Sequence, residues 1–306
     1  MGKIKKDSLG DRMKQYEAVN DRILVPKMPF IIRVDGKAFH TYTRGFKKPF
    51  DEILGDTMRK VAIKLCEEIP GAVLGYTQSD EITIVCKYTD RIVSQAWFNG
   101  RVRKIETIAA SKATKWFNKI FSEKATELRN EFWLKVRNDA YELSADVFNA
   151  ESQEKADKLA EKIANNTVKE QPNFDLYVRK AGLAEFDARV FNVPEWDCIN
   201  NVIWRQQDAI RNSVEMVGHA NFSTKELHKV NCEGIKKMLK EQRGIDWEKD
   251  FNCYQKYGAF CYRIETQKEV KGKTVTRNEW YCNKYEEFIV QEDRARFAVL
   301  TDLMED

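Results

Sequence analysis

One short β-rich segment of this chain ends at an aspartate and another begins at one, and this arrangement limits the fold more than any other feature of the sequence. Residues 29–34 form a largely apolar, β-branched run that ends at Asp35. Residues 73–87 alternate around a Ser-Asp turn that contains Asp80, which predicts a β-hairpin. If the first segment and the second hairpin strand are antiparallel neighbours, both aspartates lie at the same end of one sheet.

The segments between and after these strands predict two helices and a fourth strand. Apolar residues recur at helical spacing over residues 54–66 and again over residues 97–121. Residues 186–193 then alternate like a strand before a proline. The order strand, helix, strand, strand, helix, strand is the split β-α-β unit of ferredoxin-like folds. The sequence therefore predicts an α+β fold, in which an antiparallel β-α-β-β-α-β sheet is covered on one face by two helices.

The C-terminal part predicts further helices and a closing hairpin. Residues 195–216 are expected to be helical, and an S-x-x-E capping box at residues 223–226 predicts the start of another helix. Residues 257–264 and 274–281 alternate on either side of a Lys/Gly-rich turn, which predicts a β-hairpin.

One long segment does not fit the sheet. Residues 122–184 are charged and helix-prone, above all from Glu151 to Ala164, and are expected to form a helical insertion or limb. The expected divisions of the chain are residues 1–121, 122–184, 185–222 and 223–306.

The composition excludes several classes of protein. Lys and Arg number 52 against 48 Asp and Glu, a formal net charge of +4, which permits a polyanionic partner without requiring one. Seven cysteines without a C-x-x-C pair argue against a disulfide framework and a zinc knuckle. No apolar run approaches the roughly 18 residues of a membrane helix. We therefore expect a cytoplasmic protein with no membrane partner.

The two aspartates suit a magnesium site. Two carboxylates and a backbone carbonyl are hard oxygen ligands, and Mg²⁺ takes its remaining ligands from water and substrate phosphates. Two such ions would support phosphoryl or nucleotidyl transfer. Asp-Gly and Ser-Asp are also ordinary turn dipeptides, so only the predicted topology joins Asp35 to Asp80.

Candidates for phosphate binding surround the first aspartate. Gly36 lets the backbone of residues 36–40 approach a triphosphate, with successive amides directed at its oxygens. Lys48 and Lys104 are candidates to neutralise the remaining charge, although single lysines are more often solvated surface residues. His40, one of three histidines, is a further candidate, although it could equally cap a helix or pack against other side chains. There is no Walker A motif, no G-x-G-x-x-G and no local signature of a Ser-His-Asp or Cys-His hydrolase.

Five blocks in this order resemble the successive signatures of the histidine-tRNA guanylyltransferase superfamily. They are Ile32–His40, Lys47–Asp51, Tyr76–Glu81, Phe186–Val190 and Trp204–Ala209. The resemblance implies a ferredoxin-like polymerase palm that works in reverse and adds nucleotides in the 3′ to 5′ direction to the 5′ end of an RNA. It also implies two Mg²⁺ ions, GTP or other nucleoside triphosphates and ATP as substrates, tRNA as a partner, and a homotetramer built as a dimer of dimers.

The same resemblance assigns roles to individual residues. It makes Asp35, the Gly36 carbonyl and Asp80 the metal ligands, and it adds Glu81 to the catalytic residues in a supporting rather than a ligating role. The residues expected to contact the nucleotide fall into two groups. The backbone of the loop after the first strand and the hairpin turn supply Gly36, Lys37, Ala38, Phe39, His40 and Ser79. The residues expected to hold the triphosphate are Lys48, Lys104 and Asn212.

One departure from the family pattern bears on the substrate. Eukaryotic-type members carry a His-Ile-Asn-Asn run after the Trp-Arg-Gln block, and Ile210 stands here in place of the histidine while Asn212 is kept. The resemblance then favours the branch that repairs truncated tRNA 5′ ends by copying the opposite strand. A dedicated guanylyltransferase that adds G at the −1 position, a non-catalytic tRNA-binding protein and a nucleotide cyclase are the alternatives.

Overall fold

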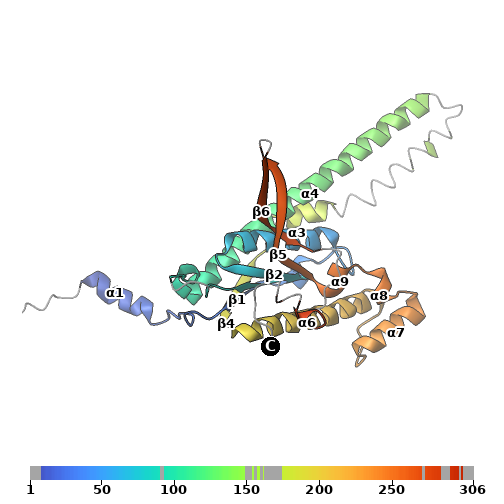
Figure 1. Ribbon diagram of the computed structural model, residues 1–306. Helices are drawn as coiled ribbons and strands as arrows, with labels where there is room; N and C mark the ends of the chain where they lie inside the picture. The colour runs from blue at the N-terminus through green and yellow to red at the C-terminus, as the bar shows by residue number, and fades with distance from the viewer. Residues whose placement is uncertain are drawn as a thin grey trace, which may run out of the picture.

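A six-stranded antiparallel sheet of order β4-β1-β3-β2-β5-β6 forms the centre of the molecule in the computed structural model (Figure 1). The structure describes residues 8–89, 93–148, 174–270, 273–283 and 290–295, together with residues 154, 157, 158, 161 and 298. The strands are β1 Phe30–Gly36, β2 Ala72–Gln78, β3 Glu81–Cys86, β4 Phe186–Asn192, β5 Ala259–Val270 and β6 Lys273–Cys282. The order of β1 to β4 confirms the predicted split β-α-β arrangement.

Helices cover both faces of the sheet, whereas the sequence predicted helices on one. Helices α3 (Glu52–Glu68) and α4 (Val102–Phe148) lie on one face, and α6 (Glu195–Asn221) lies on the other (Figure 1). Because side chains alternate along a strand, Ile32 and Val34 of β1 join the core under α3 and α4, whereas Arg33 and Asp35 face the side of α6. At β1, the face under α3 and α4 is therefore apolar, whereas the face on the side of α6 carries charged side chains.

Helix α4 crosses the predicted boundary between the palm and the insertion without a break. It is 47 residues long, and neither Gly nor Pro interrupts it, so the chain stays helical across position 122. Its first half packs on the sheet, and its second half projects from the body of the molecule (Figure 1). The predicted limb helix from Glu151 to Ala164 lies almost wholly outside the described residues.

The C-terminal extension packs against the end of α6 and against the edge of the sheet. The remaining helices are α1 Leu9–Ala18, α2 Phe39–Tyr42, the 3₁₀ helix η1 Trp97–Gly100, α7 Cys232–Arg243, α8 Trp247–Asp250 and α9 Cys253–Tyr257. The predicted closing hairpin is β5 and β6, and β5 pairs with β2 through residues 259–261. The hairpin therefore extends the sheet, which the sequence did not predict.

The capping-box prediction at residues 223–226 is wrong about the helix. Both hydrogen bonds of the box form, since the Ser223 amide donates to the Glu226 carboxylate and the Glu226 amide donates to Ser223 Oγ. The chain makes only a turn, because Lys229 adopts a left-handed φ of 61° that a continuing α-helix does not allow. The next helix begins at Cys232, capped by Asn231.

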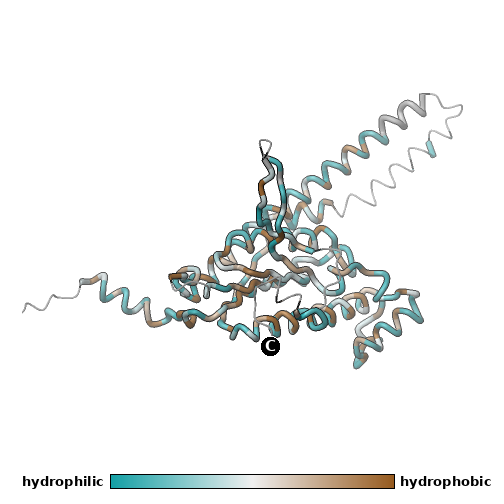
Figure 2. Tube along the Cα trace, viewed as in Figure 1, coloured by the Kyte–Doolittle hydropathy of each residue, from teal (hydrophilic) through white to brown (hydrophobic). Residues whose placement is uncertain are grey.

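No helix of the described segments combines the length and the apolar character needed to cross a bilayer. Hydrophobic residues gather instead in the strands and in the adjoining parts of the helices (Figure 2). All seven cysteines are free thiols, in agreement with the sequence, which argued against a disulfide framework.

An aromatic cluster beneath the loop that follows β1 fixes the position of that loop. Phe39 of α2 lies 5.5 Å from Phe117 of α4 and 5.1 Å from Phe186 of β4, measured between ring centroids. Phe117 also stacks on Phe121 at 5.5 Å and is fully buried. Aromatic contacts of this kind add to the free energy of burial. Helix α4 thus anchors the loop that carries the predicted nucleotide contacts.

We expect Phe117→Ala to lower the free energy of unfolding by about 3–5 kcal/mol, because it removes a buried ring from this cluster and leaves a cavity. Leu134→Ala on the same helix removes a half-exposed side chain and should change stability by about 0.5 kcal/mol or less. Urea denaturation followed by circular dichroism measures both. Equal losses in the two variants would contradict the assigned role of the cluster.

Candidate active site

Asp35 and Asp80 meet at one end of the sheet, where the sequence predicted them. Asp35 pairs in register with Glu81 of β3, the residue that follows Asp80. The Gly36 amide donates a hydrogen bond of 3.1 Å to the Asp80 carbonyl, which joins the end of β1 to the β2–β3 turn. Ser79 holds that two-residue turn in a left-handed conformation with φ of 47°. Non-glycine residues in this region are uncommon and cluster at functional sites.

The two carboxylates carry charge that the folded protein does not fully compensate. Burial raises the pKa of Asp80, the charge of Asp35 raises it further, and a hydrogen bond from Ser79 Oγ to Asp80 Oδ1 at 3.0 Å opposes the rise. Burial also raises the pKa of Asp35, with a further contribution from Asp187, which faces it in register across β4. A pair of carboxylates of this kind favours a bound cation.

The donor set fits Mg²⁺. In the described part of the chain, no group of three or more His, Cys, Asp or Glu side chains is placed to hold a metal. Two carboxylates and the Gly36 carbonyl would therefore leave several coordination positions open. Mg²⁺ fills such positions with water and substrate phosphates, whereas a structural zinc site is closed by protein ligands.

A cavity of about 490 Å³ opens beside Asp80. Its walls come from the loop after β1, from residues 46–51 and from the β2–β3 turn, and Lys48 lines it. Pockets for small ligands usually measure about 300–1,000 Å³, so the cavity has the size that a nucleotide needs. Of the three histidines, only His40 lines it.

The loop after β1 presents backbone amides to this cavity, but fewer than the sequence predicted. The amides of Gly36 and Lys37 already donate to the carbonyls of Asp80 and Glu185. Within the described residues, no acceptor contacts the amides of Ala38, Phe39 and His40. Ala38 has a left-handed φ of 54°, which turns the chain at this point. Three amides therefore remain for an anion.

Lys37 and Lys104 lie outside the cavity. Lys37 Nζ forms an exposed ion pair of 2.6 Å with Glu185. Lys104 lies near the start of α4, its ammonium 4.8 Å from the centroid of the Phe98 ring. Two residues further along α4, Glu106 accepts a hydrogen bond from the amide of Val190. Val190 pairs with Ile32.

Ile32 lies three residues before Asp35, about 10 Å along the strand. The following turns of α4 run toward Phe186 at the catalytic end, so its start, with Lys104, faces the opposite end of the sheet. This chain by itself does not bring Lys104 to the aspartates.

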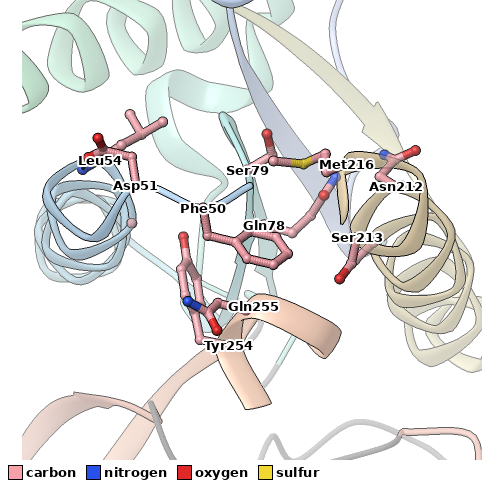
Figure 3. Close-up of a pocket in the computed structure, with 13 residues that line it drawn as sticks. Phe50, Asp51, Leu54, Gln78, Ser79, Asn212, Ser213, Met216, Tyr254 and Gln255 are labelled. Carbon is pink, nitrogen blue, oxygen red and sulfur yellow. Dashed lines mark hydrogen bonds between the residues drawn. The ribbon is translucent and has the colours of Figure 1, made fainter. Parts of the chain in front are cut away.

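A second, narrower cavity of about 70 Å³ adjoins the first (Figure 3). Phe50 occupies its centre, α6 contributes Asn212 and Met216 on one side, and α9 contributes Tyr254 from below. Ser79 and Met216 line both cavities. Asn212, predicted from the sequence, thus reaches the site from α6. Its amide donates to Asp208 at 3.3 Å.

Glu81 is held in a buried ion pair, which the sequence analysis missed. Arg205 of α6 donates from Nε to Glu81 Oε1 at 2.6 Å and from Nη2 to Oε2 at 2.9 Å. The same Nη2 donates to Asp208 at 2.9 Å. Both Glu81 oxygens are therefore occupied by Arg205, which supports a structural rather than a ligating role. An arginine and an aspartate at i,i+3 in the Trp204–Ala209 block were the available signal.

Comparisons with known proteins agree with this site. The sequence matches the tRNAHis guanylyltransferase family over residues 10–194. A bacterial tRNA(His) guanylyltransferase-like protein in complex with ATP superimposes with a TM-score of 0.69 at 30% identity, covering 96% of this chain and 99% of its own. The complex of such a protein with GTP gives a TM-score of 0.65 at 29% identity over the same shares.

Two further comparisons differ in how much of the chain they cover. An uncharacterised protein of Acanthamoeba polyphaga mimivirus is 28% identical over 88% of this chain and 82% of its own length. A probable tRNA(His) guanylyltransferase of Dictyostelium discoideum is 30% identical over 31% of this chain and 36% of its own length.

An antiparallel sheet with paired aspartates beside a nucleotide-sized cavity fits a nucleotidyltransferase. Because the family match spans more than half of the chain, this chain belongs to the tRNAHis guanylyltransferase family, and it is a 3′-5′ nucleotidyltransferase of that family, acting on tRNA 5′ ends. The family resemblance seen in the sequence is confirmed.

We expect Asp80→Asn to raise the Tm of the metal-free protein by about 2 °C at neutral pH. The pKa of Asp80 is raised in the folded chain, so its ionised form destabilises the fold above that pKa, and acidification relieves the cost. Asparagine removes the charge but still accepts the Ser79 hydrogen bond. The gain should vanish at acidic pH. Mg²⁺ with GTP should stabilise the wild type only; a variant still stabilised by Mg²⁺ and GTP would contradict the ligand assignment.

We expect Arg205→Ala to lower the free energy of unfolding by about 3–5 kcal/mol, because it leaves the Glu81 carboxylate buried without its partner. The double variant Arg205→Met with Glu81→Gln should lose clearly less. Arg211→Ala, which removes an exposed arginine that also pairs with Asp208, should cost about 1 kcal/mol or less. Denaturant titration separates these cases, and a double variant as unstable as the single one would argue against the pair.

Proposed function

We propose that this protein repairs truncated tRNA 5′ ends by template-dependent addition of nucleotides in the 3′ to 5′ direction. The observation that carries the proposal is the surface that α6 presents to the site. Asn212 lines the cavity, whereas Ile210 packs in the apolar cluster formed with α7 and α8. Neither cavity therefore receives an imidazole from α6 for a fixed contact with one tRNA. The solved bacterial guanylyltransferase-like proteins, similar to this chain over nearly their full length, support the same branch.

The residues of the chain would divide the reaction into binding and positioning. Lys48 would neutralise charge on the triphosphate of the incoming nucleotide, and the amides of Ala38, Phe39 and His40 would donate hydrogen bonds to it, because hydrogen bonds to ionised phosphate oxygens are strong. Asp35, Asp80 and the Gly36 carbonyl would hold Mg²⁺. When bound, two such ions supply charge neutralisation and activation of the attacking 3′-hydroxyl. That hydroxyl loses its proton to solvent and forms the new bond to the phosphorus of the RNA 5′ end, while pyrophosphate from a 5′-triphosphate end, or AMP from an end activated with ATP, departs with the electron pair.

Glu81 and Arg205 would position this machinery. Their ion pair joins the strand that follows Asp80 to α6, and Asp208 extends the connection to Asn212. A shift of α6 would therefore move both a metal ligand and a nucleotide contact. The predicted homotetramer and the cytoplasmic location remain predictions.

To test the proposal, purified protein and Mg²⁺ are incubated with each nucleoside triphosphate in turn and with tRNAs of several identities that lack their first 5′ nucleotide. We expect addition of the nucleotide complementary to the opposing base, and a change of that base should change the nucleotide added. Asp80→Asn should lose about 1,000-fold or more in rate, since a metal site supplies several kcal/mol to the transition state. Preferential addition of a single G to intact histidine tRNA, whatever the opposing base, would favour the dedicated guanylyltransferase instead.

A further inference from the structure

Within the described part of the chain, one corner of the sheet beside Asp35 is left open on the face that α6 covers elsewhere. Helix α6 begins just after β4 and crosses beneath the sheet toward α8 and α9 (Figure 1). Its apolar contacts on this face include Ile31 and Tyr76, which lie away from the corner. The first half of β4 is exposed there, and Asp187 and Arg189 project from it into solvent.

Two arginines lie side by side in this corner. Arg33 of β1 and Arg189 of β4 are in register, which places their Cβ atoms about 4.5–5.5 Å apart on the same face. Arg33 reaches Glu81 at only 4.0 Å, and Arg205 already occupies both oxygens of that carboxylate. The Arg189 guanidinium forms no ion pair or hydrogen bond within the described residues.

In the strand order, Arg189 and the turn that carries Asp80 flank β1 on different sides, since β4 pairs with one edge of β1 and β3 with the other. Asp80 lines the cavity, and Asp35 interacts electrostatically with Asp80, Arg33 and Arg189. The arginine pair is two residues from Asp35 along the strands, about 7 Å. A reaction that joins a nucleotide to an RNA end at Asp35 and Asp80 needs the two substrates to approach from different sides.

We propose that Arg33 and Arg189 bind the 5′-terminal phosphate group of the RNA substrate and place it at Asp35 and Asp80. This inference rests on the proposed function. The planar fork of an arginine donates two parallel hydrogen bonds to phosphate oxygens, and two neighbouring forks match a terminal phosphate. Asp187 is the acidic neighbour on this edge, and its exposure to water and salt weakens its repulsion of the ligand.

The test measures binding apart from catalysis. Wild type, Arg189→Ala and Arg189→Lys are titrated with one truncated tRNA that carries a 5′-triphosphate, a 5′-monophosphate or a 5′-hydroxyl, using fluorescence anisotropy. Arg103→Ala, which removes an exposed arginine at the other end of the sheet, is the matched control. Binding of GTP with Mg²⁺ is measured separately by calorimetry. Arg189 is exposed on an edge strand, so its variants should fold, and their Tm values check this.

We expect Arg189→Ala to weaken binding of the phosphorylated RNAs about tenfold, as the loss of a charge-assisted contact predicts. Arg189→Lys should restore part of the affinity, and the 5′-hydroxyl RNA and GTP should bind as they do to the wild type. Equal weakening for all three RNAs would overturn the proposal in favour of a contact along the RNA backbone. Weaker GTP binding with unchanged RNA binding would overturn it in favour of the triphosphate, and no change would overturn it outright.

These binding measurements, taken together with the nucleotide-addition test of the proposed function, separate this inference from that function. A wild-type protein that adds no templated nucleotide to any tRNA would contradict the proposed function. A wild-type protein that adds nucleotides while Arg189→Ala binds every RNA end normally would contradict the inference alone.

Discussion

Carboxylate charge at one end of the central sheet is the constraint to which the surrounding structure responds. Asp35 and Glu81 pair on two neighbouring antiparallel strands, and Asp80 lies in the turn directly before Glu81, so the topology itself crowds three acids together. Burial raises the pKa of all three carboxyls, but among the described residues only Glu81 is held in an ion pair, by Arg205. The fold thus pairs Glu81 and leaves Asp35 and Asp80 for a cation. Glu81 thereby supports the fold, while the adjacent Asp80 is left for the chemistry.

The register of β1 makes this division strict. Ile32 and Val34 face the core under α3 and α4, and Arg33 and Asp35 face the other side. A shift of one residue would bury both charged side chains in that apolar core and expose the apolar ones, at a cost of several kcal/mol. The aromatic cluster around Phe117 adds a second restraint, because it holds Phe39 and with it the loop that turns toward the cavity. Apolar packing on one face therefore positions polar chemistry at the end of the other.

The sequence predicted the parts of this arrangement that depend on local patterns. Strand alternation and the Ser79-Asp80 turn were sufficient to place Asp35 and Asp80 together, since antiparallel neighbours leave few topologies open. It did not predict Arg205 as the partner of Glu81, because a buried ion pair between residues 124 positions apart leaves no periodic signal. It could not foresee that the Lys37 amide is already bonded to Glu185, or that Lys104, at the start of α4, lies toward the end of the sheet away from the aspartates. Both facts depend on how α4 and β4 run past each other in three dimensions.

Protection of the exposed edge of β4 does not by itself explain why Arg189 faces Arg33 in the open corner. Edge strands commonly carry charged residues that discourage pairing with other chains, and Asp187 and Arg189 would serve that purpose in any order. Protection of the edge does not require Arg189 to face Arg33, and like charges directly across two strands destabilise a sheet. An acidic residue at either position would have protected the edge and formed a cross-strand ion pair as well. Both arginines oppose the rise in the pKa of Asp35, so the pairing keeps positive charge beside the catalytic carboxylates, and an anion bound by both arginines would offset their mutual repulsion.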